Sequence, residues 1–121
     1  MTRVKRSLSA RKKRRATLAL TKGFRGEAHS NYRRAKEALL KADAYAYRDR
    51  RNRKRDFRRL WITRINAAAR ANGMSYSQFM HGIALAGIEL DRKVLADIAV
   101  RDPETFSRFA DTAREASSAA A

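Results

Sequence analysis

The side chains of this chain that are best suited to chemistry are cations, and they are crowded into its first half. Up to Arg64 the sequence holds 23 Lys and Arg residues against 5 Asp and Glu, a net charge of +18, whereas the remainder holds 6 against 7. The stretch Arg48–Arg59 alone has 8 basic and 2 acidic residues in 12 positions. A guanidinium can donate two parallel hydrogen bonds to a phosphate or stack on a base. Such a segment needs a polyanion to oppose its self-repulsion, which indicates a nucleic-acid partner.

Residues that could support catalysis or bind a metal are few. His29 lies in the cationic half, and His81 has no carboxylate or second histidine at ligand spacing. Ser75 and Ser77 have no nearby base, and helix capping explains Ser75. No glycine-rich loop joins a strand to a helix. The sequence therefore predicts no enzyme, no metal, no cofactor and no small-molecule substrate.

Composition also bears on the compartment. The absence of cysteine excludes disulfides and is compatible with a reducing compartment. No stretch of about 18 apolar residues is present to span a membrane, and the basic N-terminus lacks the apolar core of a secretory signal. We expect a cytoplasmic protein with no membrane contact.

Helices must position the cations, because no strand-like alternation occurs anywhere in the sequence. Ser9 is expected to cap a helix that runs to about Thr21, and Gly23 follows where a left-handed residue is favoured. From Glu27 to Asn72 there is no Gly or Pro, which predicts one long helix, or two helices with a bend. At 1.5 Å per residue that segment would be about 65–70 Å long.

On such a helix the cations of Arg48–Arg59 would cover roughly two-thirds of the circumference, since each residue advances by about 100°. Asp49, Asn52 and Asp56 fill the remaining sector. A DNA groove would leave much of this charge in water, whereas a folded RNA can present phosphates from several sides. This distribution favours RNA.

After Gly73 the pattern is that of a small globular helical domain. Helices are predicted from a Ser75 cap to about Ala86, from an Asp91 cap to about Val100, and from Asp102-Pro103 to about Ala116. Their apolar spacing predicts a core of Phe79, Ile83, Ile88, Leu90, Val94, Leu95, Ile98, Phe106 and Phe109, joined by Trp61 and Ile65. The predicted fold is all-α, with a basic helical arm (1–59), a globular domain (60–117) and a disordered tail (118–121).

Aromatic residues lie among the cations of the arm. Phe24, Tyr32, Tyr45, Tyr47 and Phe57 could stack on unpaired bases. The alternative for Tyr32, Tyr45 and Phe57 is that these rings pack against neighbouring helices or proteins.

Several motifs place the chain beside a known family. The segment KRDFRRLWITRINAAAR (Lys54–Arg70) is the most specific, and RVKR (Arg3–Arg6), KGFRG (Lys22–Gly26), YAYRDRRNRKR (Tyr45–Arg55), NGMSYSQF (Asn72–Phe79) and GIELDRKVLADIA (Gly87–Ala99) support it. With these motifs the chain resembles the bacterial L-twenty family, the twentieth protein of the large ribosomal subunit. The resemblance implies an arm threaded into ribosomal RNA, a helical C-terminal domain on the RNA, and a role early in subunit assembly. Some members repress their own synthesis by binding their messenger RNA.

The resemblance implies RNA contacts by arm residues Arg3, Lys5, Arg6, Lys22, Arg48, Arg50, Arg51, Arg53, Lys54, Arg55, Arg58, Arg59 and Arg64. The C-terminal domain would add Asn66, Arg70, Asn72, Ser75 and Ser77. From charge alone we add the other basic residues of the arm, namely Arg11, Lys12, Lys13, Arg14, Arg15, Arg25, Arg33, Arg34 and Lys36. The expected partners are large-subunit ribosomal RNA and neighbouring proteins of the large subunit.

Two other functions compete with this interpretation. A basic nucleoid protein that compacts DNA would also carry a cationic arm, and comparable affinity for random duplex DNA would support it. A membrane-active helix would need an apolar face opposite its charge, and Arg48–Arg59 has none.

Overall fold

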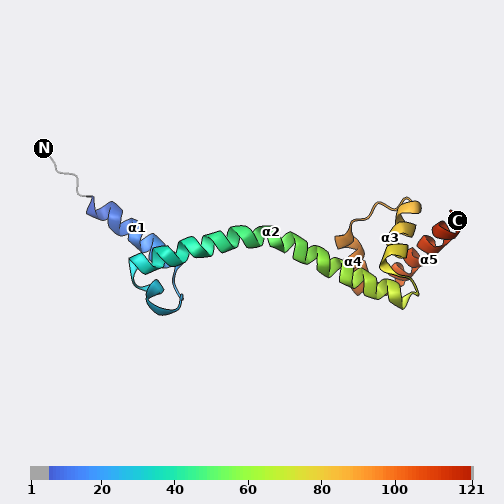
Figure 1. Ribbon diagram of the computed structural model, residues 1–121, viewed down its shortest axis with the longest axis horizontal. Helices are drawn as coiled ribbons and strands as arrows, with labels where there is room; N and C mark the ends of the chain where they lie inside the picture. Colours follow the sequence, from blue (N-terminus) through green and yellow to red (C-terminus); the bar gives the residue numbers. More distant parts are fainter. Residues whose placement is uncertain (1–5, 121) are drawn as a thin grey trace. The chain divides into compact units, whose positions relative to one another are not determined.

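The computed structural model describes residues 6–120, which form five α-helices and one 3-10 helix without any strand (Figure 1). In chain order these are α1 (Ser7–Leu20), η1 (Gly26–His29), α2 (Tyr32–Ala71), α3 (Tyr76–Leu85), α4 (Arg92–Arg101) and α5 (Pro103–Ala119). The predicted all-α class is confirmed. The chain divides into two compact units, Met1–Arg51 and Asn52–Ala121, and the division falls inside α2.

Helix α1 begins at Ser7, so the prediction that Ser9 caps it is wrong. Arg6 precedes the helix, its side chain makes no capping hydrogen bond, and the first turn holds no acidic residue. At the other end Gly23 has a φ of 85°, the left-handed conformation that its position after the helix predicts. This helix is therefore anchored at its C-terminal end and weakly supported at its N-terminal end.

The N-terminal unit buries little apolar surface. Among its described residues Thr21 and Ala35 are fully buried, and the Thr21 hydroxyl donates to the Leu18 carbonyl over 3.3 Å. Helix α1 also approaches the start of α2, where the Arg14 guanidinium lies over the Tyr32 ring, 5.8 Å from its centroid. Two small side chains are a minimal core, so this unit has little of its own to oppose the repulsion between its cations.

Helix α2 is one α-helix of 40 residues, which resolves the choice between one helix and two. It begins at Tyr32 rather than near Glu27, because Gly26–His29 form a separate 3-10 turn. The Asn31 side-chain oxygen accepts from the Arg33 backbone N–H at 3.1 Å, as an N-terminal cap does.

The three predicted caps of the C-terminal unit are confirmed. Ser75 and Gln78 form a capping box at the start of α3. Asp91 accepts from the Val94 N–H at 2.8 Å to begin α4. Asp102 accepts from the Thr105 N–H at 3.0 Å, with Pro103 in the first turn of α5. The residues at the caps therefore determine where these three helices begin.

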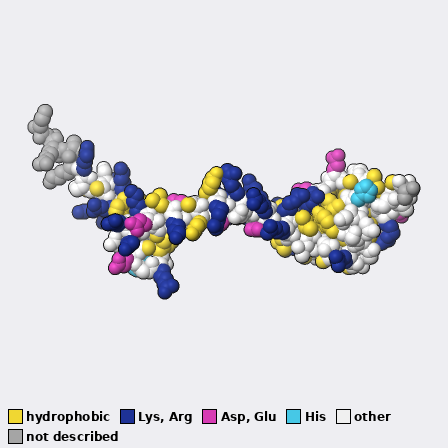
Figure 2. Space-filling model, in the orientation of Figure 1, with side chains coloured by type: hydrophobic (Ala, Val, Ile, Leu, Met, Phe, Trp, Pro, Cys, Tyr) yellow, Lys and Arg dark blue, Asp and Glu magenta, His cyan; other side chains and the backbone are white. Residues whose placement is uncertain are grey.

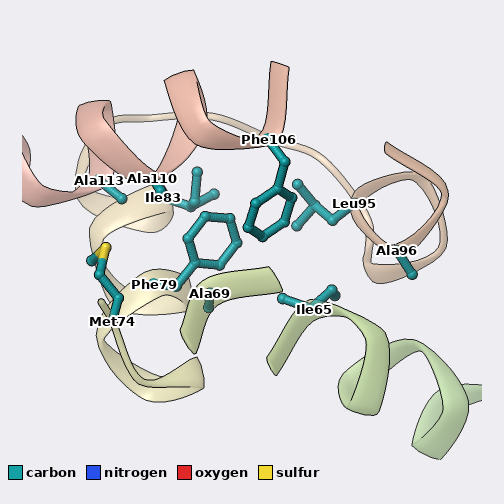
Figure 3. Close-up of a cluster of buried hydrophobic side chains, with 10 residues drawn as sticks. All are labelled: Ile65, Ala69, Met74, Phe79, Ile83, Leu95, Ala96, Phe106, Ala110 and Ala113. Atoms are coloured by element: carbon teal, nitrogen blue, oxygen red, sulfur yellow. The ribbon is translucent and has the colours of Figure 1, made fainter. Parts of the chain in front are cut away.

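Helices α3, α4 and α5 pack with the end of α2 around two stacked rings. Figure 3 shows Phe79 of α3 facing Phe106 of α5, and their centroids are 4.7 Å apart. The predicted residues Ile65, Phe79, Ile83, Leu95 and Phe106 are buried, and Trp61, Ile88, Leu90, Ile98 and Phe109 pack half-buried around them. Val94 is 42% exposed, so its predicted place in the core is wrong. The core also holds Ala69, Met74, Ala96, Ala110 and Ala113, which the sequence did not identify.

The predicted boundary after residue 59, between the basic arm and the globular domain, stays a prediction. Helix α5 extends to Ala119, and the predicted disorder of residues 118–121 also stays a prediction. Arg3 and Lys5, both predicted RNA contacts, lie outside the described residues.

Candidate nucleic-acid interface

Every predicted cationic contact within residues 6–120 lies on the surface. In the N-terminal unit the exposed cations are Arg6, Arg11, Lys12, Lys13, Arg14, Arg15, Lys22, Arg25, Arg33, Arg34, Lys36, Arg48, Arg50 and Arg51. In the C-terminal unit they are Arg53, Lys54, Arg55, Arg58, Arg59, Arg64 and Arg70. On the face drawn in Figure 2, Lys and Arg side chains follow α1 and α2 and are sparser over the other helices. Each unit therefore offers cations to a partner.

Among residues 6–120, most of these cations have no acidic partner. Arg33 and Arg34 both pair with Glu37, at 3.6 and 3.3 Å. Arg48 donates to Asp49 over 2.8 Å, which raises the pKa of its guanidinium. Across the described part of the chain, no carboxylate pairs with Arg50, Arg51, Arg53, Lys54, Arg55, Arg58, Arg59 or Arg64. The cations in the middle of α2 thus remain available to phosphates.

Cations of the same helix lie over two of the tyrosines that were predicted to stack on bases. The Tyr45 ring has Arg48 at 4.8 Å and Lys41 at 6.0 Å from its centroid. The Tyr47 ring has Arg51 at 4.9 Å, and the Arg51 guanidinium also donates to the Tyr47 hydroxyl over 2.8 Å. These contacts orient the cations, and any base that stacks here must share the ring with a charged group.

The other two candidates are less open. Phe24 is half-buried beside η1, and His29 Nδ1 lies 3.2 Å from its carbonyl oxygen. Tyr32 is 36% exposed and carries Arg14 over its ring. Base stacking by these four residues and by Phe57 stays a prediction.

Several polar candidates of the C-terminal unit are engaged within the chain. The Asn66 side-chain oxygen accepts from Arg70 Nε at 3.3 Å. Asn72 donates from its side-chain amide to the Ala68 carbonyl over 2.9 Å, which closes the end of α2. The Ser75 hydroxyl belongs to the capping box of α3, whereas Ser77 is exposed. Asn72 and Ser75 therefore have a structural role that does not require RNA.

Lys41, and the contact between Phe57 and Trp61, were not included in the predicted interface. Lys41 is exposed and lies one turn before Tyr45, a spacing that could have identified it. Phe57 and Trp61 place their ring centroids 6.2 Å apart on α2, and Phe57 is 48% exposed. Phe57 and Trp61 are also one helical turn apart, so the same spacing could have identified this pair.

Other kinds of site receive no support from the part of the chain that the structure describes. Residues 6–120 contain no group of three or more His, Cys, Asp or Glu side chains arranged to hold a metal ion. None of the helices described is both long enough and apolar enough to traverse a bilayer.

Exposed, unpaired cations on helices beside a small apolar core define a basic, all-helical nucleic-acid-binding protein. The chain belongs to the family of Ribosomal protein L20, whose model matches residues 3–109. It is 60% identical to the large ribosomal subunit protein bL20 of a Roseiflexus species, over 96% of this chain and 99% of the relative. The bL20 protein of Acidithiobacillus ferrooxidans is 59% identical, over 94% and 96%. That of Rubrobacter xylanophilus is 57% identical, over 96% and 87%.

Proposed function

We propose that this chain is a structural constituent of the large ribosomal subunit and binds the RNA of that subunit directly. The observation that carries the proposal is the run of exposed cations from Arg50 to Arg64 on α2, none of which pairs with a carboxylate among residues 6–120, in a chain that belongs to the L20 family. The chain matches these relatives over nearly their whole length, and they are named as proteins of the large ribosomal subunit. The protein acts in the ribosome, in the cytoplasm, beside neighbouring large-subunit proteins. It is not an enzyme.

The mechanism is charge neutralisation along helices. Arg and Lys side chains at i and i+4 on α2, such as Arg51 and Arg55, repel each other by a few tenths of a kcal/mol per pair in water. Phosphates placed between them convert that repulsion into charge-assisted hydrogen bonds. RNA segments that otherwise repel one another can then approach on opposite sides of the same helix, which supports early assembly of the subunit.

The same argument predicts that ordering of the arm depends on RNA. The N-terminal unit has a minimal core of Thr21 and Ala35, and α1 lacks a cap and an acidic first turn. The C-terminal unit has a larger core and three side-chain caps. We therefore expect the globular domain to fold alone and the arm to gain helix when RNA is added. Repression of its own messenger RNA stays a prediction.

The salt dependence of binding tests the proposal. With 8–10 phosphates neutralised, log K for large-subunit ribosomal RNA should fall against log[salt] with a slope of about −6 to −9. A slope near −2 would mean that the arm is not engaged. Random duplex DNA is the matched competitor, and equal affinity for it would support the nucleoid alternative instead. Sedimentation of a cell lysate, with the chain travelling in the large ribosomal particle, is the complementary measurement.

A further inference from the structure

An exposed aromatic ledge lies on α2 in the C-terminal unit, formed by Phe57 and Trp61. Their rings are tilted by 37° with centroids 6.2 Å apart. Trp61 packs half-buried against the hydrophobic core of the domain. Phe57 lies outside that core and is 48% exposed. Trp61 therefore fixes the ledge to the folded domain, while Phe57 presents an open ring.

This ring differs from the exposed tyrosines of the N-terminal unit. Tyr32, Tyr45 and Tyr47 each have a cation over the ring. Among residues 6–120 no cation lies over Phe57. Its π-face is thus free for a planar ligand, and its contact with Trp61 restricts how the ring can turn.

The charges around the ledge point to the kind of ligand. Residues three and four positions from Phe57 or Trp61 lie beside them on the helix, and Arg53, Lys54, Arg58 and Arg64 occupy such positions. All four are exposed, and none pairs with a carboxylate in the described chain. Asp56 is the one acid between residues 52 and 64, and it lies about 100° around the helix from Phe57.

We infer that the Phe57–Trp61 ledge is a stacking site for one unpaired nucleobase of the bound RNA, with the phosphates beside that base held by the surrounding cations. The inference rests on the proposed function. It adds to the proposed function because phosphate contacts carry no sequence information, whereas a base can reach this ledge only where it is unpaired. The ledge thus selects a bulge, loop or junction in the RNA.

Three substitutions at Phe57 separate stacking from packing. Phe57→Ala removes the ring and should weaken binding to large-subunit ribosomal RNA by roughly 5- to 150-fold, the range for loss of one base–aromatic stack. Phe57→Leu keeps an apolar side chain without a π-face and should lose nearly as much. Phe57→Tyr keeps the ring and should bind as the native chain does. Val100→Ala, which trims a 61% exposed apolar side chain on α4, is the control and should have no effect.

The salt dependence distinguishes this site from the phosphate contacts. Phe57→Ala should lower the affinity at every salt concentration and leave the slope unchanged, because it removes no charge. Lys54→Gln should make the slope less steep by about 0.7–0.9, as expected for one phosphate contact.

Trp61 supplies a direct readout, since it is the only tryptophan in the sequence. Its fluorescence should be quenched when oligoadenylate or large-subunit ribosomal RNA is added to the full chain, and unchanged when inorganic polyphosphate is added. Polyphosphate carries the charge without the bases.

The outcomes separate the two proposals. If the native chain shows steep salt dependence and both Phe57→Leu and Phe57→Ala bind the RNA as tightly as it does, the ledge is not a stacking site. The proposed function would then be unaffected. Full affinity for Phe57→Leu alone would indicate apolar packing, as against another protein, and would also overturn the stacking site. If polyphosphate quenches the fluorescence of Trp61 as much as RNA does, the stacking site is also contradicted. If RNA binding by the native chain shows no steep salt dependence, the proposed function is contradicted, and so is the stacking site that rests on it.

Discussion

Arg51 and Arg55 lie one helical turn apart on α2, and both are exposed. Arg51 is held by its own helix, because its guanidinium contacts the Tyr47 hydroxyl and ring. Neither Arg51 nor Arg55 has an acidic partner among the described residues. At the scale of the single residue, the candidate site consists of cations that lie one turn apart on the same helix and have no acidic partner among the described residues.

The double change Arg51→Ala and Arg55→Ala should weaken binding to ribosomal RNA and make the slope of log K against log[salt] less steep by about 1.4–1.8, because two phosphate contacts are lost. The loss should be similar for cognate and mutated RNA sequences, since phosphate contacts carry no sequence information. Titration at several salt concentrations measures both effects.

The matched control is Arg101→Ala with Arg108→Ala, which removes the same charge from α4 and α5. Arg101 already pairs with Asp97 over 2.9 Å. An equal change of slope in this control would contradict the assignment of the interface to α2.

A second residue-scale prediction concerns Gly82, which is buried where α3 crosses α5. A Cβ there would overlap the Ala113 carbonyl oxygen and would lie 2.7 Å from the Ala113 Cβ. Gly82→Ala should therefore lower the free energy of unfolding of the globular domain by about 1–3 kcal/mol, as overpacking of a close contact does. Denaturant unfolding measures it, and Ala84→Gly, at an exposed position of the same helix, controls for intrinsic helix propensity. Unchanged stability in Gly82→Ala would mean that the two helices are farther apart.

At the scale of the element, the N-terminus of α5 depends on an ionised side chain. The Thr105 hydroxyl and backbone N–H both donate to the Asp102 carboxylate, at 2.6 and 3.0 Å. These hydrogen bonds lower the pKa of Asp102 from its ordinary value of 3.8. A carboxyl whose pKa falls on folding stabilises the fold above its unfolded pKa, and this contribution is lost as the pH falls through the folded value.

We therefore expect the melting temperature of the globular domain to decrease below about pH 3.8, in part through Asp102. Asp102→Asn keeps a capping oxygen but does not titrate. The difference in melting temperature between the native chain and this variant should narrow as the pH is lowered from 5 to 2. Thermal unfolding followed by circular dichroism measures it, and a difference that does not vary with pH would contradict the role given to this cap.

Local chemistry explains which elements were predictable. The side chains of Ser75, Asp91 and Asp102 each accept a hydrogen bond from a backbone N–H in the first turn of the following helix, so these helix starts follow from the sequence. Ser9 failed as a cap because α1 begins two residues earlier. Serine is also compatible with a helix interior, and residues 6–16 are all exposed, so no packing pattern marks where this helix begins.

The core was predictable for large side chains and not for small ones. Phe79, Leu95 and Phe106 stand out by size and spacing, whereas Ala110 and Ala113 carry a weak hydrophobic signal. Those alanines are buried because α5 approaches α3 closely, and that approach becomes visible only in three dimensions. Val94 is exposed because Leu95 and Ala96 set the inner face of α4.

The candidate site was predictable as a charge pattern and less so as a geometry. Exposure of the cations follows from the cost of burying unpaired charge, so Arg50 and Arg58 could be placed on the surface from sequence alone. The cations over Tyr45 and Tyr47, and the tilt of Phe57 against Trp61, depend on rotamers that spacing permits but does not select.

At the scale of the whole molecule, the two units have opposite balances of charge and apolar burial. Met1–Arg51 carries many cations around a minimal core, whereas the globular domain is near neutral in net charge after Arg64 and buries ten side chains. Folding of the globular domain can therefore precede RNA binding. We expect the arm to gain its main stabilisation from phosphates, so its order and its affinity should rise together.

Amide hydrogen exchange of residues 32–51 within α2, measured on the full chain with and without large-subunit ribosomal RNA, tests this central claim most directly. In the free chain at physiological salt these amides should exchange rapidly while those of α3 and α5 are protected. Added RNA should slow exchange across the whole segment. Strong protection of residues 32–51 in dilute buffer, with nothing bound, would contradict an arm that RNA phosphates bring into order.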